Sequence, residues 1–177
     1  LSDSKAMRWT ALVLLAGAMF FAYIFMDILS PLQSLLQTSR GWTPEAFGHY
    51  AGSETFLNVF VFFLIFAGII LDKMGVRFTA VLSGTVMFIG GAINYYAVTD
   101  AFAGSALDTF FTNHLNLPQA WWNVTPWFEG MPASAKLAAC GFMVFGCGAE
   151  MAGITVSRGI VKWFTGHEMA LAMGMEM

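Results

Sequence analysis

The sequence predicts an all-α fold, a bundle of membrane-spanning helices that holds four spans and the start of a fifth. Three observations lead to this prediction. Apolar residues make up 58% of the 177 residues and charged residues only 11%, whereas soluble domains contain about 25% charged residues. The apolar residues fall into runs near the length of about 20 residues that a spanning helix needs. These runs are uniformly apolar and do not alternate as the strands of a barrel do.

The composition also excludes several classes of protein. A net charge of −3 gives no electrostatic footprint for nucleic acid, and so apolar a chain is neither disordered nor an ordinary soluble domain. The sequence contains no nucleophile–base pair, paired acid cluster or metal triad, so we expect no enzyme activity. His49, His114 and His167 fall on different segments, and we therefore expect neither a metal nor a cofactor.

The first two spans are predicted over 9–36 and 44–72. The first continues past Asp27, and Pro31 is expected to kink it. The second begins at Thr43–Glu45, which supplies a capping residue, a first-turn proline and an acidic first turn. These start signals are independent of hydropathy, and they place the beginning of the second span well before its apolar run.

The remaining spans are predicted over 78–98 and 136–164, with a fifth starting at about 168. The loop over 99–135 is rich in aromatic residues, so we expect short interfacial helices in it. Asn123 opens a glycosylation sequon in this loop. Small residues in the third and fourth spans predict close helix packing. They include Gly84, Gly90, Gly91, Gly141, Gly146, Gly148 and Gly153.

Basic residues orient the predicted bundle, because cytoplasmic loops carry an excess of Lys and Arg. If the N-terminus is cytoplasmic, most of the basic residues lie on that side. They are Lys5, Arg8, Lys73, Arg77, Arg158 and Lys162, against Arg40 and Lys136 outside. The sequence therefore predicts a multi-pass protein with a cytoplasmic N-terminus, in a bacterial inner membrane or a eukaryotic endomembrane.

A short charged motif links the second and third spans. Gly75 permits the left-handed conformation that ends a helix, and Lys73 and Arg77 follow the positive-inside pattern. Asp72 ends the second span, and Gly68 is expected to let another backbone approach. These features alone are compatible with a well-formed cytoplasmic turn and no further role.

The same residues resemble the signature of the major facilitator superfamily, a glycine followed by an Asp–basic pair, a second glycine and a basic pair. Val76 replaces the first residue of the final basic pair. In the family this loop binds the other half of the transporter through its Asp and stabilises the outward-open state. The resemblance therefore implies that role for Asp72, supported by Lys73 and Arg77.

Other segments agree with this resemblance. The segment 41–48 resembles the family's entry to the second span. Segments 23–33, 145–150 and 163–168 resemble the branch that contains the lysosomal dipeptide transporter. Phe142 stands where many members carry an arginine associated with proton coupling, and this departure puts that coupling in doubt. The family fold has two six-helix halves, so residues 1–177 are expected to be an incomplete N-terminal half that binds the rest of its polypeptide.

Ionisable groups within predicted spans are costly and are candidate site residues by default. Glu150 lies near the middle of the fourth span. Ser157 follows seven residues later on nearly the same face, and Arg158 comes directly after Ser157. Glu150 is either a substrate or coupling carboxylate, or a structural partner for a group on another helix. Arg158 either binds an anionic substrate group or is an interfacial charge.

Polar residues of the first two spans complete the predicted solute-binding set. Tyr23 and Asp27 share a face of the first span, and Gln33 follows six residues later. Asn58 lies in the second span, one turn after Glu54. Glu54 is expected near the outer surface in contact with water. The alternative for Asp27 is a solvated helix end, and for Asn58 an interhelical hydrogen bond.

The resemblance implies a secondary transporter that carries a small organic solute by rocker-switch alternating access. A peptide, an amino acid or an organic anion is the expected solute, with Glu150 binding an amine. The alternative is a four-helix membrane scaffold or receptor subunit without a transport cycle. The expected partners are the lipid bilayer, the small-molecule solute and the remainder of the same polypeptide, and not nucleic acid.

Overall fold

The computed structural model describes residues 4–114, 128, 130–164 and 166–176. Every regular element within these ranges is helical, which confirms the all-α prediction. The elements are α1 (Lys5–Asp27), the 3-10 turn η1 (Ser30–Leu32), α2 (Gln33–Arg40), α3 (Pro44–Phe60), α4 (Phe63–Ala97), α5 (Ala106–Asn113), α6 (Ala133–Trp163) and α7 (His167–Glu176). Three helical stretches, Lys5–Arg40, Phe63–Ala97 and Ala133–Trp163, are long and apolar enough to cross a membrane by length and composition alone, and the second of them reverses direction at Gly75.

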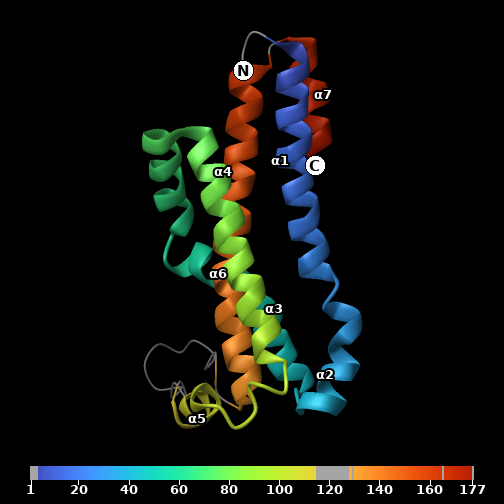
Figure 1. Cartoon of the computed structure of the whole chain (residues 1–177), viewed down its shortest axis with the longest axis vertical. Coiled ribbons are helices and arrows are strands. Elements are labelled where there is room, and N and C mark those ends of the chain that lie inside the picture. The colour runs from blue at the N-terminus through green and yellow to red at the C-terminus, as the bar shows by residue number, and fades with distance from the viewer. Residues whose placement is uncertain (1–3, 115–127, 129, 165, 177) are drawn as a thin grey trace.

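The first helical stretch turns where the sequence contains a proline. α1 ends at Asp27, and Pro31 occupies the first turn of η1, where its missing N–H group costs no hydrogen bond. α2 then runs to Arg40 and is closed by Gly41, whose φ of 68° is left-handed. The expected segment 9–36 is therefore two helices joined by a turn (Figure 1).

The second predicted span begins as expected but is divided in the middle. The Thr43 side chain accepts a hydrogen bond from the backbone N–H of Ala46 and caps α3. α3 ends at Phe60, and Phe62 adopts a left-handed conformation with φ 54° before α4 begins. The residues from 59 to 63 are all valine or phenylalanine, which lose side-chain freedom in a helix. This local preference weakens the helix here, although hydropathy does not reveal the break.

α4 consists of two arms that run in opposite directions and meet at Gly75 (Figure 1). Gly75 has φ 80° and ψ 170°, outside the helical region, and glycine adopts this conformation at no steric cost. The predicted turn at Gly75 is therefore confirmed, although its ψ lies outside the left-handed helical conformation that was expected to end the helix. The second arm ends at Ala97, and a buried hydrogen bond of 2.8 Å from the Tyr50 hydroxyl to Asn94 Oδ1 ties it to α3.

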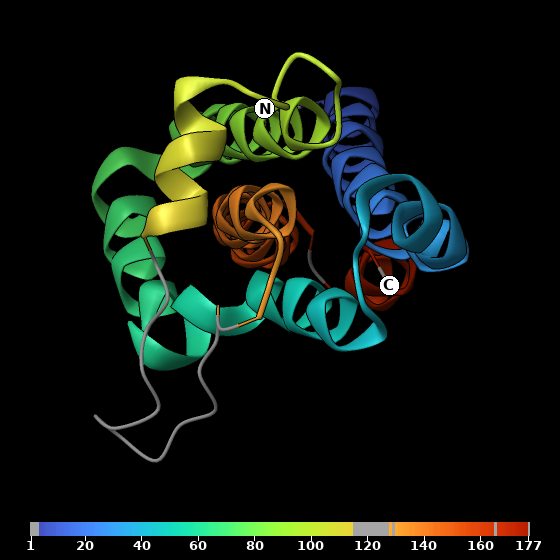
Figure 2. The same cartoon turned by 90° about the horizontal axis from the view of Figure 1, so that it is seen from below.

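α6 lies in the centre of the bundle, with the other helices around it (Figure 2). Glycines allow backbone contact: a Cβ at Gly90 would lie 2.5 Å from the Phe145 nitrogen, and one at Gly148 would lie 2.8 Å from the Ser83 carbonyl oxygen. The predicted close packing of the third and fourth spans is confirmed at these positions. At Gly68 a Cβ would meet no described atom within 4 Å, so the expected backbone approach there is absent.

The segment between α4 and α6 contains one described helix, α5, as expected for a structured loop. The Ser105 side chain caps it by accepting from the backbone N–H of Asp108. Lys136, which the sequence places on the outer side, is 2% exposed, and its Nζ atom donates to the carbonyl oxygen of Phe111 at 2.9 Å. Asn123 and the tryptophans of this loop lie outside the described residues.

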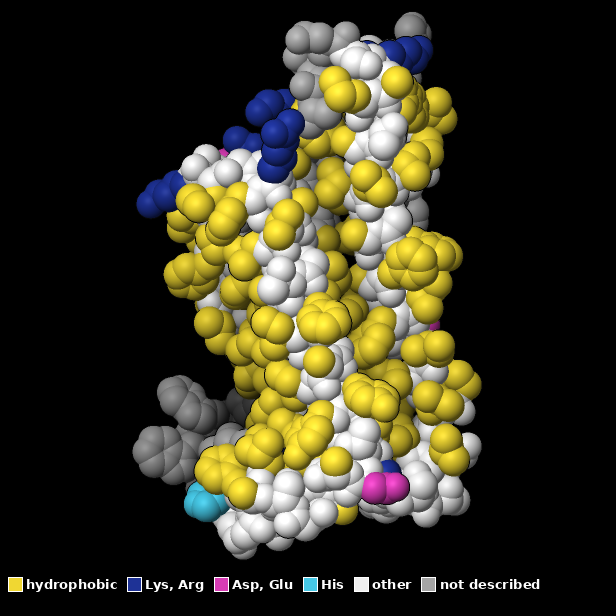
Figure 3. Space-filling model, in the orientation of Figure 1, with side chains coloured by type: hydrophobic (Ala, Val, Ile, Leu, Met, Phe, Trp, Pro, Cys, Tyr) yellow, Lys and Arg dark blue, Asp and Glu magenta, His cyan; other side chains and the backbone are white. Residues whose placement is uncertain are grey.

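The surface separates charge from apolar side chains. In Figure 3 the visible Lys and Arg side chains gather mainly at the upper end, and apolar side chains cover the length between the two ends. We call the upper end the basic end. It contains Lys5, Arg8, Lys73, Arg77, Arg158 and Lys162. α7 begins there, one residue before the predicted start of the fifth span at about 168.

Candidate functional site

Three carboxylates on three helices lie in one region of the bundle, with Glu54 within electrostatic reach of the other two. Asp27 ends α1, whereas Glu54 lies within α3 and Glu150 within α6. The charges of Glu150 and Asp27 both act on Glu54. Glu54 and Glu150 are half-buried, and Asp27 is exposed. Ionisable groups retained among apolar helices are candidates for ligand binding, and a cluster of carboxylates suits a positively charged ligand.

A glycine of α6 brings two of these carboxylates together. A Cβ at Gly146 would lie 2.1 Å from the carbonyl oxygen of Glu54, so α3 and α6 touch backbone to backbone at this point. Glu150 lies one helical turn beyond Gly146, on the same face of α6. The close contact therefore explains why Glu54, which the sequence places near the outer surface, belongs to the same cluster as Glu150.

Asn58 adds a neutral polar group one turn beyond Glu54. The residue is 9% exposed, and its Nδ2 and Oδ1 atoms make no hydrogen bond to any described residue. α3 and α6 run in the same direction (Figure 1), so Asn58 and Glu150 each lie one turn beyond the contact at Gly146. Leaving a buried amide unpaired costs about 1–3 kcal/mol. The predicted interhelical hydrogen bond of Asn58 is therefore absent among these residues.

The break between α3 and α4 comes shortly after Asn58 in the chain. Phe62, four residues after Asn58, holds a left-handed conformation that is unfavourable for a phenylalanine. A helix end leaves carbonyl oxygens of its last turn without intrahelical partners. Asn58 itself belongs to this last turn of α3.

Arg158 is separate from this cluster. It lies eight residues after Glu150 on α6, about 12 Å along the helix, and its guanidinium forms a hydrogen-bonded ion pair with the carboxylate of Asp72. Of the two alternatives for Arg158, this contact favours the charge at the end of the span. The pair joins the turn of α4 to the last turns of α6.

The other residues of the turn motif surround this ion pair. Lys73 and Arg77 are exposed on either side of Gly75, and Gly68 is half-buried. This geometry is compatible with both alternatives from the sequence, a plain turn and a switch element. The ion pair with α6 is the feature that the sequence did not predict, because it joins residues 86 positions apart.

The remaining predicted residues lie at the edges of the cluster. Tyr23 and Asp27 line a shallow hollow of about 460 Å³ on the exposed side of α1. Gln33 is half-buried at the start of α2, and Ser157 is exposed on α6. No contact recorded for the described residues joins Gln33 to the carboxylates. The structure therefore groups Asp27, Glu54, Asn58 and Glu150, with Tyr23 beside Asp27.

Sequence reasoning missed the contacts that hold the basic end. The guanidinium of Arg8 donates to the Trp163 carbonyl oxygen at 2.8 Å, lies 5.7 Å from the Phe164 ring centre and is 3.5 Å from Glu168. Lys5 forms a second ion pair with Glu168, with 2.7 Å between Nζ and Oε1. α1, α6 and α7 thus meet at Trp163, Phe164 and Glu168, which belong to a segment singled out by resemblance.

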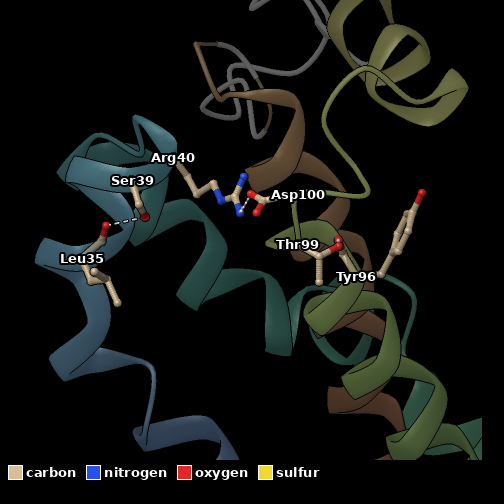
Figure 4. A network of polar contacts seen from close by, with 6 residues as sticks. All are labelled: Leu35, Ser39, Arg40, Tyr96, Thr99 and Asp100. Atoms are coloured by element: carbon tan, nitrogen blue, oxygen red, sulfur yellow. Dashed lines mark hydrogen bonds and ion pairs between the residues drawn. The ribbon is translucent and has the colours of Figure 1, made fainter.

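Two further contacts lie far from the basic end. Arg40 forms a hydrogen-bonded ion pair of 2.7 Å with Asp100 and links α2 to the end of α4 (Figure 4). Phe142 stacks on Tyr50 with ring centres 4.8 Å apart. Position 142 therefore carries an uncharged aromatic side chain that packs against α3.

Comparisons with known proteins do not assign the chain to a family. No protein-family model matches the sequence, and neither a curated protein nor a solved structure matches it. The carboxylate cluster, the unpaired Asn58 and the ion pair of Arg158 are therefore the observations on which a function is argued.

Proposed function

We propose that the chain is part of a multi-pass secondary transporter, which carries a small organic solute by rocker-switch alternating access. In this proposal it is related to the major facilitator superfamily, and its N-terminus is cytoplasmic. Further helices of the same polypeptide complete the solute cavity. A solute with an ammonium group, such as an amino acid or a peptide, suits the site better than a purely anionic one.

The observation that carries the proposal is the polar cluster between apolar helices. Glu54 and Glu150 lie on two helices that touch at Gly146, and Asn58 is buried beside them without a partner. Carboxylates and an unpaired amide are expensive in an apolar bundle, and polar groups retained there usually bind a substrate or a proton. A solute ammonium would neutralise the carboxylates and give Asn58 a hydrogen-bonding partner.

The divided second span supports the same function. Transporters bind solutes near the middle of the bilayer, commonly beside discontinuous helices whose freed backbone groups take part in binding. The break at Phe62 lies one turn from Asn58. A polar cluster and a helix break in the same place are what this mode of binding requires.

The ion pair between Asp72 and Arg158 supports a conformational switch. Both side chains are more than half exposed, so the pair is weak and easily broken. It joins the turn of α4 to α6, the helix that carries Glu150. Breaking it would free the turn without disturbing the buried core, as a movement between two states of similar energy requires.

Flux into liposomes tests the proposal. The full-length product of the reading frame that contains this chain is reconstituted, and uptake is measured for labelled amino acids, peptides and organic anions. Glu150→Gln is expected to lower uptake about tenfold or more, because it removes a charge-assisted interaction with the ammonium. Glu45→Gln, an exposed carboxylate at the start of α3, is the matched control and is expected to retain uptake.

A second variant separates binding from folding. Asn58→Leu removes the unpaired amide, so the protein is expected to become more stable by about 1 kcal/mol while uptake is lost. Absence of flux for every class of solute, with correctly folded protein, would contradict the proposal and favour the scaffold alternative. Equal uptake by the Glu150→Gln variant would remove Glu150 from the site.

A further inference from the structure

A hollow of about 430 Å³ lies at the basic end, between the turn of α4 and the last turns of α6. It is distinct from the carboxylate cluster, because Arg158 is eight residues beyond Glu150. Its lining comes from both helices. The lining residues are Leu71, Asp72, Gly75 and Val76 from α4, and Arg158, Val161 and Lys162 from α6.

The hollow and its rim carry an excess of positive charge. Lys162 and Arg158 line one wall, and Lys73 and Arg77 flank Gly75 on the other side. Among the described residues Lys73, Arg77 and Lys162 form no salt bridge. Asp72 is the one acidic residue of the lining, and it contacts a single nitrogen of Arg158. A guanidinium has five N–H donors, so Arg158 can bind an anion while it contacts Asp72.

Apolar side chains adjoin the charged lining. Val161 is 58% exposed at the edge of the hollow, and Met74 and Phe78 are 54% and 45% exposed on the neighbouring turn of α4. The exposed apolar length of the helices begins at this level (Figure 3). A ligand that fits both surfaces has an anionic phosphate attached to hydrocarbon chains, and a free phosphate would leave the apolar edge uncovered.

From this geometry we infer that the hollow binds the phosphate of an anionic phospholipid, with Arg158 and Lys162 as donors. Basic pockets between helices at the inner membrane surface are suited to such headgroups. The phosphate would share the Arg158 guanidinium with Asp72, and repulsion between the two anions would weaken the link between the turn of α4 and α6. The inference requires the chain to lie in a membrane, but it does not depend on transport.

Lipid titration tests the inference on the full-length protein in an uncharged detergent. Short-chain phosphatidylglycerol, phosphatidylcholine and inorganic phosphate are titrated separately, and the Kd of each is measured by calorimetry. Phosphatidylglycerol is expected to bind at least about tenfold more tightly than the other two, because only it combines net negative charge with hydrocarbon.

Two matched variants locate the binding. Lys162→Gln and Lys73→Gln each remove one positive charge at the same end, but only Lys162 lines the hollow. Lys162→Gln is expected to weaken phosphatidylglycerol binding about fivefold, the effect of about one basic side chain near an anionic lipid. Lys73→Gln is expected to change it less than about twofold. Asp72→Asn is expected to strengthen binding, because it removes the one negative charge of the lining that would repel the phosphate.

Three results would overturn the inference. Equal weakening by Lys162→Gln and Lys73→Gln would show a diffuse charge effect and no site. Inorganic phosphate binding as tightly as phosphatidylglycerol would show that hydrocarbon has no part. Equal binding of phosphatidylglycerol and phosphatidylcholine would show that the negative charge of the headgroup has no part in binding. The melting temperature of each variant without lipid shows whether it is folded, and because flux is not measured, this test is independent of the proposed function.

Discussion

α6 and α1 are both long and apolar, yet they occupy opposite environments. In the most apolar stretch of α6, 72% of the residues are buried, against 11% for the stretch that begins with α1. α1 is nevertheless the more apolar of the two. Large side chains such as Leu14 and Phe21 on α1 are 70% and 69% exposed. Hydropathy therefore does not decide which helix becomes the centre of this bundle.

The difference lies in the size of the side chains. α6 presents glycines to its neighbours, and a Cβ at Gly141 would lie 2.9 Å from the carbonyl oxygen of Gly90. In a bilayer, apolar side chains gain nothing by leaving lipid, so helices associate by close van der Waals contact between small residues. α1 offers bulky side chains instead, and in the proposed transporter these face lipid or the helices that complete the fold.

The strongest test of this comparison enlarges one glycine on each helix. Gly146→Leu forces a side chain against the backbone of Glu54, where even a Cβ would lie 2.1 Å from oxygen. Backbone cannot move aside as a side chain does, so the cost is expected to exceed the usual range of about 1–3 kcal/mol for overpacking. We expect no monodisperse protein in size-exclusion chromatography.

Gly17→Leu on α1 is the control, because a Cβ there meets no described atom within 4 Å. This variant is expected to fold with an unchanged melting temperature. Recovery of folded Gly146→Leu at the same level would show that α6 is not held by backbone contact.

A smaller effect is expected from shortening one isoleucine on each helix. Ile160 of α6 is fully buried and Ile24 of α1 is 41% exposed. Ile160→Ala is expected to cost about 3 kcal/mol through lost contacts and a residual cavity. Ile24→Ala is expected to cost less than about 1 kcal/mol. Thermal unfolding in detergent measures both, and equal shifts would contradict the difference in packing between the two helices.

The smallest effect is expected at the charged contact between α1 and α7. Glu168 pairs with Lys5 and Arg8, and the Lys5 side chain is 70% exposed. Exposed ion pairs contribute little to stability, so Glu168→Gln is expected to shift the melting temperature less than Ile160→Ala does. A cysteine cross-link between α1 and α7 is expected to form less readily in this variant, and an unchanged cross-linking yield would show that packing alone holds α1.

Local features of the fold were predictable from the sequence. The cap at Thr43, the turn at Gly75 and the start of α7 depend on residues within a few positions of one another. The break at Phe62 was missed, because no glycine or proline marks it and the apolar run continues through it.

The candidate site was predictable only in part. Glu150 and Asn58 stand out because a charge and an amide are costly within apolar segments. The inclusion of Glu54 and the pairing of Arg158 with Asp72 were not predictable. Both depend on how closely α3, α4 and α6 approach one another, and spacing along one helix contains no information about that approach.

The sequence by itself determined the helical class, the apolar stretches long enough to cross a membrane, and the helix ends at Thr43 and Gly75. These follow from side-chain hydropathy and from backbone preferences that act over one or two turns. Only the tertiary structure decided that α6 is central, that Glu54 joins Glu150, and that Asp72 holds Arg158. The physical reason is that contact between distant helices depends on the shapes of two surfaces at once, and neither surface alone specifies its partner.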